Sequence, residues 1–144
     1  MCFLFFSSLG LYSDPEKAKE EFVYDLSLAT QGIMVSQYNT GVNYSLGLGI
    51  HIDMEKSVYW FQEATKQGHS KAPFNIAIIY GNGEVTDKNL ALALEYFLMA
   101  AERGNEEAKE LIKKLEKDSG LSMEESLEKI CCPKPLSHSM VSKN

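Results

Sequence analysis

The chain has 144 residues, of which 44% are hydrophobic and 24% charged, and its formal net charge is −6. A chain of this size suits one domain that buries about two-thirds of the surface exposed by the unfolded form. The acidic balance, without a block of Lys or Arg, argues against nucleic acid as a partner, and no apolar run approaches the roughly 20 residues that span a bilayer.

An apolar stretch, MCFLFFSSLGLYS, opens the chain. Its apolar run is short and has no preceding Lys or Arg, so a first buried helix is favoured, with a cleaved signal peptide as the alternative. After this stretch, Asp14 suits an N-cap, Pro15 suits the first helical position, and Gly32 lies 36 residues before Gly68. We interpret residues 1–35 as a degenerate first repeat whose helix is nearly one turn longer than its later counterparts or starts differently.

The middle of the chain repeats itself at a shift of 36 residues. Self-similarity at a fixed period of about 20 to 50 residues is typical of stacked repeat proteins. The shift pairs Asn39 with Asn75, Tyr44 with Tyr80, Gly47 with Gly83, Phe61 with Phe97, Ala64 with Ala100, Gly68 with Gly104, and Ala72 with Ala108. We therefore predict two repeats, at residues 36–71 and 72–107.

Each repeat is predicted to be a helical hairpin. The first arms lie around Val35–Leu46 and Lys71–Asn82 and carry a short apolar stripe, and Gly41 or Ala77 at matching positions lets a neighbouring helix approach closely. The second arms carry apolar or small residues at positions 0, 3, 4, 7 and 8, which is one face of an α-helix. These residues are Ser57, Trp60, Phe61, Ala64 and Thr65, and then Ala93, Tyr96, Phe97, Ala100 and Ala101.

Both ends of each second arm are marked in the sequence. Asp53 and Asn89 precede the two apolar runs as N-caps. Gly68 and Gly104 follow the runs, where a left-handed C-terminal cap favours a residue without a Cβ. The glycine-containing segments between the arms lack the Walker spacing of a phosphate-binding loop.

Residues 108–130 are predicted to form C-terminal capping helices. The charged sequence EEAKELIKKLEKD gives the first of them a solvated outer face, as a terminal repeat needs. Ser122 and Glu125 have the spacing of a capping box at the start of a last helix. Residues 131–144, with two prolines and several serines, are predicted to be a flexible tail.

The two central stretches resemble consecutive Sel-1-like repeats of the tetratricopeptide superfamily over about half of the chain. The Gly-x-x-Tyr, Asp-x-x-x-small, Trp/Tyr-Phe and final Gly-x-x-x-Ala elements follow the family's order. The departures are Thr40 where Leu is usual, Ser36 and Ser57 where Ala is usual, and Glu84 in place of the second loop glycine. The resemblance implies an all-α fold, a short right-handed α-α superhelix, or solenoid, of stacked helix-turn-helix repeats.

The same resemblance implies that the first arms line a concave surface that binds a peptide or protein segment. The candidate groove residues are Tyr38, Val42, Leu46, Lys71, Phe74, Ile78 and Asn82. Tyr38 and Phe74 could equally be core between neighbouring hairpins, whereas the core stripe does not need Val42 and Ile78. Because this groove is apolar and lacks a Lys/Arg cluster, an apolar helix or extended segment is the expected ligand.

By the family's pattern, Trp60 and Tyr96 occupy buried positions between helices and are expected in the core. No catalytic, cofactor or metal site is predicted. The three histidines never recur at i, i+4 and have no ligand partner at metal-site spacing. They are His51, His69 and His138.

The cysteines are an odd number and lie at the two ends of the chain, so no disulfide framework is readable. They are Cys2, Cys131 and Cys132. This usage fits a reducing compartment, and we expect a cytoplasmic protein, with secretion as the alternative. Acylation or redox reactivity of the adjacent pair is a further alternative.

Together these features predict a protein–protein interaction module, an adaptor or scaffold, that is not an enzyme and needs no cofactor. One alternative is a β-lactam-binding or β-lactam-hydrolysing enzyme, suggested by cysteine-rich relatives of the family; those relatives resemble a pattern with a cysteine pair in every repeat, which this chain lacks. The other is a reduced fragment of a longer solenoid adaptor, which self-association would stabilise.

Overall fold

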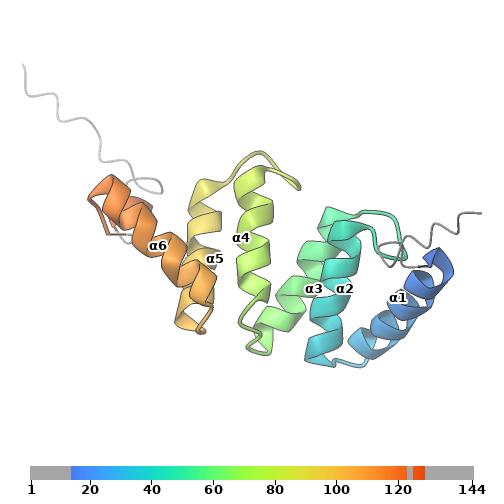
Figure 1. Cartoon of the computed structure of the whole chain (residues 1–144). Coiled ribbons are helices and arrows are strands. Elements are labelled where there is room, and N and C mark those ends of the chain that lie inside the picture. Colours follow the sequence, from blue (N-terminus) through green and yellow to red (C-terminus); the bar gives the residue numbers. More distant parts are fainter. Residues whose placement is uncertain (1–13, 123–124, 129–144) are drawn as a thin grey trace, which may run out of the picture. The chain divides into compact units, whose positions relative to one another are not determined.

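The computed structural model describes residues 14–122 and 125–128, and in these residues it is helical without strands (Figure 1). The helices are α1 (Pro15–Thr30), α2 (Met34–Leu46), α3 (Met54–Lys66), α4 (Ala72–Asn82), α5 (Leu90–Glu102) and α6 (Glu106–Ser119). A further helical turn covers residues 125–128. The all-α prediction is therefore confirmed, while the predictions for residues 1–13 and for the tail at 131–144 lie outside the described residues.

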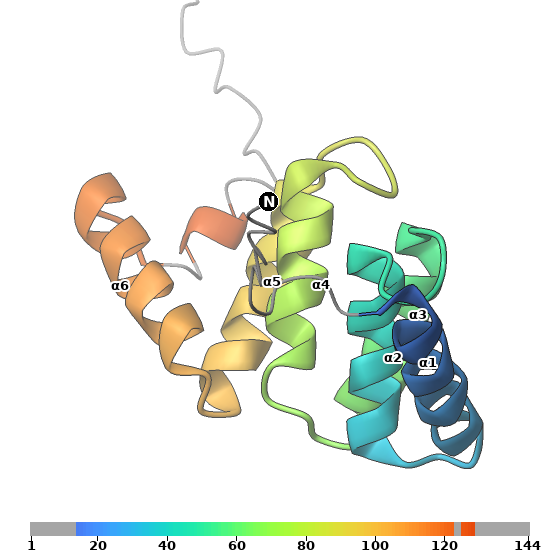
Figure 2. The same ribbon diagram turned by 45° about the vertical axis from the view of Figure 1, so that its right-hand side comes forward.

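The chain divides into two compact units between Ala64 and Thr65. In the first unit α1 packs against α2, and in the second α5 packs against both α4 and α6. Both views of the ribbon show these neighbours side by side (Figures 1 and 2).

Side-chain caps fix the starts of α1, α3 and α5 as the sequence predicted. Each cap oxygen accepts a hydrogen bond from a backbone N–H two or three residues further on, at 3.1 Å for Asp14, 3.0 Å for Asp53 and 3.0 Å for Asn89. At the other ends, Gly68 and Gly104 have φ values of 96° and 86°, the left-handed region that favours glycine. With 16 residues against 13 for α3 and α5, α1 is the longer helix, as expected.

In the first unit, Gly41 allows α2 and α3 to approach closely. A Cβ at this position would lie 2.7 Å from carbons of the buried Phe61 ring. The buried Ser57 hydroxyl donates a hydrogen bond to the Gly41 carbonyl at 2.8 Å. One turn further along the same buried side of α2, the rings of Tyr44 and Phe22 form a T-shaped pair with centroids 5.3 Å apart.

The second unit repeats this packing with small changes. Ala77 replaces the glycine and is fully buried. The rings of Phe74 and Phe97 meet edge to face at 5.4 Å. Arg103, just after α5, donates a hydrogen bond to the Thr65 carbonyl at 2.6 Å, where it covers one of the last carbonyls of α3.

Two aromatic side chains are less buried than expected. Trp60 and Tyr96 were expected in the core, and both are half-buried. Trp60 packs against the edge of the exposed Tyr59 at 5.1 Å, and Tyr96 stacks on Tyr80 at 6.1 Å. Each ring thus has an aromatic neighbour on its own or its partner helix, and this contact leaves part of the ring exposed.

The capping box after α6 is present. The Ser122 N–H donates to Glu125 Oε2 at 2.8 Å, and the Glu125 N–H donates to Ser122 Oγ at 3.2 Å. This reciprocal pair starts the helical turn at residues 125–128, as the sequence predicted.

Candidate functional site

An apolar stripe runs along the exposed side of α2. Its members, at spacings of three or four residues, are Val35, Tyr38, Val42 and Leu46, and together we call them the α2 stripe. Val35 is 56% exposed and Leu46 is 63% exposed, while Tyr38 and Val42 are half-buried. The opposite side of α2 is buried and consists of Ser36, Gln37, Thr40, Gly41 and Tyr44. The structure therefore places the predicted residues of α2 on one face, away from its buried side.

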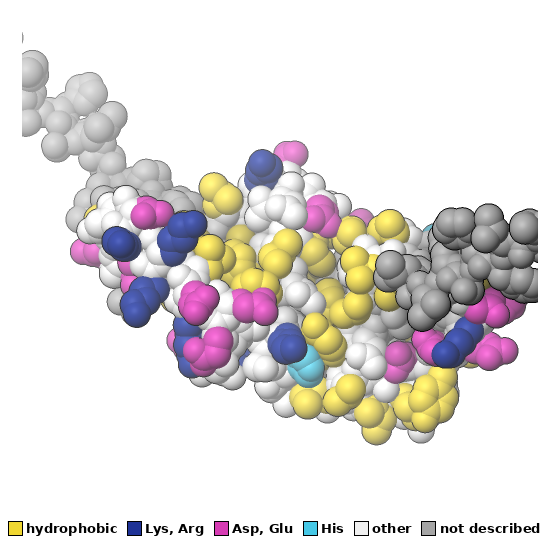
Figure 3. Space-filling view, in the orientation of Figure 1, with side chains coloured by type: hydrophobic (Ala, Val, Ile, Leu, Met, Phe, Trp, Pro, Cys, Tyr) yellow, Lys and Arg dark blue, Asp and Glu magenta, His cyan; other side chains and the backbone are white. Residues whose placement is uncertain are grey.

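The corresponding face of α4, the α4 stripe, is apolar only in its middle. Phe74 is half-buried and Ile78 is 38% exposed, whereas Lys71 and Asn82 at the two ends are exposed and polar. The Asn82 side-chain amide donates to Glu84 Oε1 at 2.8 Å, which holds the end of the stripe next to the loop. In the space-filling view, hydrophobic side chains gather over α2 and over α4 and α5 (Figure 3).

Tyr38 and Phe74 each belong to a stripe and also pack against the second arm of their hairpin. The Tyr38 ring lies 5.6 Å from the ring of Phe61, and Phe74 meets Phe97 of its own hairpin. Such aromatic pairs stabilise the contact between the two arms. The aliphatic side chains of the stripes, above all Leu46 and Ile78, remain exposed to solvent.

Sequence reasoning missed three exposed aliphatic residues on α2 and in the loop that follows it. Val35 lies two helical turns before Val42 and extends the α2 stripe. The spacing of seven residues between them could have placed Val35 on the same face. Leu48 and Ile52 are 43% and 62% exposed in the loop between α2 and α3, which the sequence marked only as a turn.

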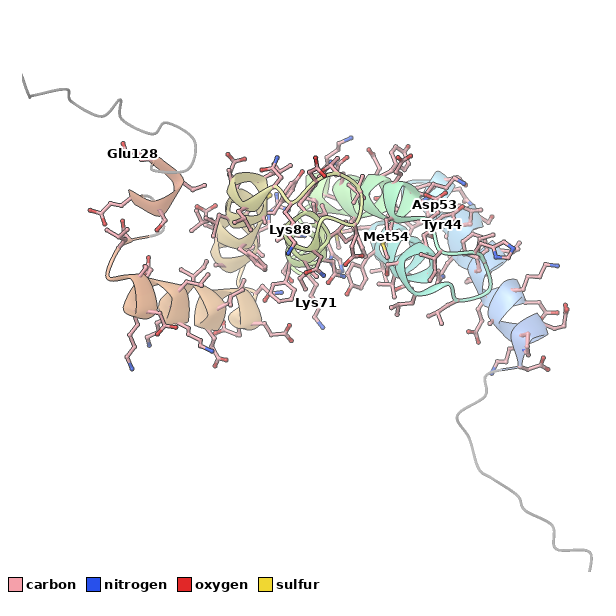
Figure 4. The ribbon with its side chains drawn as sticks, turned by 90° about the horizontal axis from the view of Figure 1, so that it is seen from above. Tyr44, Asp53, Met54, Lys71, Lys88 and Glu128 are labelled. Atoms are coloured by element: carbon pink, nitrogen blue, oxygen red, sulfur yellow. The ribbon has the colours of Figure 1, made fainter. Side chains whose placement is uncertain are left out.

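The polar groups near the stripes cap helices. Lys71 lies at the start of α4 (Figure 4), and His69 Nδ1 accepts a hydrogen bond from the Ala72 N–H at 3.2 Å. Burial lowers the pKa of His69 below its ordinary value, and the charge of Lys71 lowers it further. The neutral imidazole is the form that can accept this bond.

At the loop end of α2 and α3, Tyr44, Asp53 and Met54 lie close together (Figure 4). The Lys56 ammonium pairs with Asp53 at 2.9 Å and lies 5.4 Å from the centre of the Tyr44 ring. Hydrogen bonds from the Lys56 N–H and ammonium lower the pKa of the Asp53 carboxyl. These contacts fix the hairpin end.

The described residues contain neither a metal-binding cluster nor a membrane-spanning helix. They contain no group of three or more His, Cys, Asp or Glu side chains arranged to hold a metal ion. In the same part of the chain, no helix has the length and apolar character that crossing a bilayer requires.

Comparison with known families and structures agrees with the internal repeat. The family model of the Sel1 repeat matches residues 35–69 and 70–105. A Sel1 repeat protein from Oxalobacter formigenes matches 76% of this chain and 44% of its own, with a TM-score of 0.63 and 26% identity. The protective antigen c5321 of uropathogenic Escherichia coli, described as having an SLR fold, matches 76% and 24%, with a TM-score of 0.65 and 25% identity. The resemblance to Sel-1-like repeats and the solenoid class of the fold are thus confirmed.

Two curated proteins are similar in sequence. Proteins named DAP3-binding cell death enhancer 1 are 31% identical in Rattus norvegicus and 30% identical in Mus musculus, each over 108 residues. The match covers 75% of this chain, but the chain spans only 21% of these relatives.

Proposed function

We propose that this chain, a Sel1 repeat protein over residues 35–105, is a protein–protein interaction module that binds apolar protein segments, with the α2 stripe and the α4 stripe each acting as a binding surface. The observation that carries the proposal is the exposure of large aliphatic side chains along α2, with Leu46 at 63%. Contiguous exposed apolar surface on a folded protein marks an interaction site more often than a scattered single residue does. Sel1 repeat proteins are in general non-enzymatic interaction scaffolds, which supports the same conclusion.

The form of the stripes suggests the form of the ligand. The α2 stripe is apolar over its whole length, whereas the α4 stripe has Lys71 and Asn82 at its ends. An amphipathic helix presents anchors at i, i+3 or i+4, and i+7, the same spacing as the stripe residues. We propose a ligand of this kind for each stripe, with an apolar anchor on Leu46 of the α2 stripe or on Ile78 of the α4 stripe and its polar side toward water.

We propose no enzymatic activity for the chain. The β-lactam alternative rests on relatives with a cysteine pair in each repeat, and neither repeat of this chain contains a cysteine. Without these pairs the alternative has no residues to carry it. The cysteine usage supports a reducing compartment, and we propose the cytoplasm.

DAP3 is the first partner to test. The two similar mammalian proteins are named for binding DAP3, and their match to this chain covers 108 residues, more than the two repeats. Because the chain spans about a fifth of these relatives, the repeats would carry the DAP3 contact only if that contact lies within the matched segment.

Affinity capture with two stripe variants tests the proposal. Leu46→Arg and Ile78→Arg each place a charge on one stripe, and Tyr59→Arg on the exposed part of α3 is the matched control. Circular dichroism first verifies that all three keep the helical fold. We then compare the proteins captured from a cell lysate by mass spectrometry and titrate purified DAP3 as a candidate.

We expect a stripe variant to weaken binding by more than about tenfold, since truncating a central anchor costs about 2 kcal/mol or more. The control should bind as the wild type does. Equal binding by all variants would refute the stripes as the binding surface. Loss of lysate partners without any binding of DAP3 would retain the stripes and reject DAP3.

A further inference from the structure

The loop between α2 and α3 carries an aliphatic surface that the proposed partner site does not use. In residues 47–53, Leu48 and Ile52 are exposed and Ile50 is half-buried. The matching loop of the second repeat has Glu84 and Asp87 in this part of the hairpin. The repeat pattern therefore does not itself require aliphatic residues here.

Backbone contacts hold this loop in place. The Leu48 N–H donates to the Asn43 carbonyl at 3.0 Å, and the Asp53 N–H donates to the Tyr44 carbonyl at 3.0 Å. Gly49 has a φ of 71°, and a Cβ on it would collide with the carbonyl group of Ala18 in α1. The loop is therefore fixed against the first part of α1, beside which it lies in both ribbon views (Figures 1 and 2).

An open pocket of about 580 Å³ lies between this loop and the first turns of α1. Its apolar walls are formed by Pro15 and Ala18 on one side and by Leu48 and Ile50 on the other. The charged or polar groups at the pocket are Glu16, Lys19 and His51. Both walls belong to the first unit, so the pocket does not depend on how the chain continues after Ala64.

We propose that the first 13 residues of the sequence fold back and fill this pocket. They join the described chain at Asp14, directly before Pro15 of the pocket wall. A stretch of 13 residues reaches about 40 Å when extended, far more than the length of the pocket wall requires. The occupant is thus already tethered at the edge of the pocket.

The chemistry of the segment matches that of the walls. MCFLFFSSLGLYS contains no Asp, Glu, Lys, Arg or His, and it includes three phenylalanines and three leucines. Removing these side chains and the aliphatic walls from water together is favourable, and no charged side chain of the segment has to be desolvated. Docking withdraws Leu48 and Ile50 from other partners.

Paramagnetic broadening from Cys2 tests this arrangement in the full chain. Cys2 lies inside the segment, and replacing Cys131 and Cys132 by Ser leaves it as the only thiol for a spin label. We expect a loss of amide signal intensity in loop residues 47–51 and in the first turns of α1. Undiminished loop signals in the labelled protein would overturn the proposal.

A mixed sample separates docking within one chain from docking between two copies. Isotope-labelled protein without a spin label is combined with spin-labelled protein without isotope, and the loop signals should then keep their intensity. Broadening that persists in this mixture would contradict docking within the chain and would indicate a second copy.

A surface variant gives an independent check. Leu48→Gln should reduce the broadening of the neighbouring loop amides, whereas Leu115→Gln on α6, also at an exposed leucine, should leave it unchanged. Equal broadening in both variants would reject the pocket as the docking site. The result is independent of partner binding, because neither variant lies on a stripe.

Discussion

Two buried hydroxyl groups at positions where the repeat family usually has apolar residues have opposite roles. The Ser57 hydroxyl bonds to the Gly41 carbonyl and so links the two arms of the first hairpin. The Thr40 hydroxyl is completely buried and has no hydrogen-bond partner among the described residues. A buried polar group without a partner costs about 1–3 kcal/mol.

We therefore predict that Thr40→Val raises the free energy of unfolding by about 1 kcal/mol, because Val keeps the shape and removes the unpaired hydroxyl. Ser57→Ala should lower it by about 1 kcal/mol, although alanine is the usual residue there, because a satisfied hydrogen bond is lost. Urea denaturation measures both. If both variants shift in the same direction, the assignment of the hydroxyl groups is wrong.

Gly41 and Gly81 provide a second contrast between residues of one type. An added Cβ at Gly41 would press on the buried Phe61 ring, whereas at Gly81 it would lie 3.7 Å from Ala93 in ordinary contact. Alanine favours a helix over glycine by about 1 kcal/mol, and overpacking a core costs about 1–3 kcal/mol.

Gly81→Ala should therefore raise the midpoint of thermal unfolding, and Gly41→Ala should lower it. Adding Phe61→Leu to Gly41→Ala should recover part of the loss, since the ring is the obstacle. An increase in the midpoint for Gly41→Ala alone would show that α2 and α3 are not in close contact at this point.

At the scale of the helices, the start of α4 depends on a histidine. His69 Nδ1 accepts from the Ala72 N–H, and its pKa is lowered by burial and by Lys71. Because the folded state favours the neutral imidazole, its contribution to stability is fully present above the ordinary pKa of 6.5 and decreases as the pH falls through the range below that value.

We predict that the free energy of unfolding of the wild type decreases between pH 7 and pH 5 by more than that of His69→Asn. Asparagine can still accept the hydrogen bond through its side-chain oxygen but does not titrate. His51→Asn in the exposed loop is the matched control. Chemical denaturation at a series of pH values measures the slope, and identical slopes for wild type and His69→Asn would contradict the role of this side chain.

The helix boundaries were the part of the fold best predicted from sequence, because local chemistry sets them. Asp14, Asp53 and Asn89 cap helices by accepting hydrogen bonds from N–H groups two or three residues further on. The glycines after α3 and α5 have positive φ angles, which the local end of a helix favours. Trp60 was predicted less well, because its burial depends on how neighbouring helices cover it, and periodicity does not specify that coverage.

The same limit applies to the candidate site at the scale of the whole molecule. The spacing of Val42 and Leu46 placed them on one face of α2, and the structure shows that face exposed. Tyr38 belongs to the stripe and also packs against Phe61. This second contact could not be predicted, because it depends on how the second arm packs against α2. The pocket beside Ala18 could not be read from the sequence, since its walls come from segments about 30 residues apart.

At the scale of the whole molecule, the described residues contain two segments that match the Sel1 repeat and helices on both sides of them, and the proposed function depends on surfaces that the fold leaves apolar. Each unit contributes its own stripe, so the two can be tested separately. A partner that requires both should be lost from either stripe variant, and one that requires a single stripe should be lost from only one.

Site-specific photo-crosslinking tests the central claim most directly. A photoreactive phenylalanine analogue replaces Leu46 or Ile78 on the stripes, or Tyr59 on α3 as the reference position, and crosslinked proteins are identified after irradiation with the partner. The proposal predicts a covalent adduct with the partner from at least one of the two stripe positions and none from Tyr59. An adduct from Tyr59 alone would place the binding surface on the second arms and contradict the function proposed here.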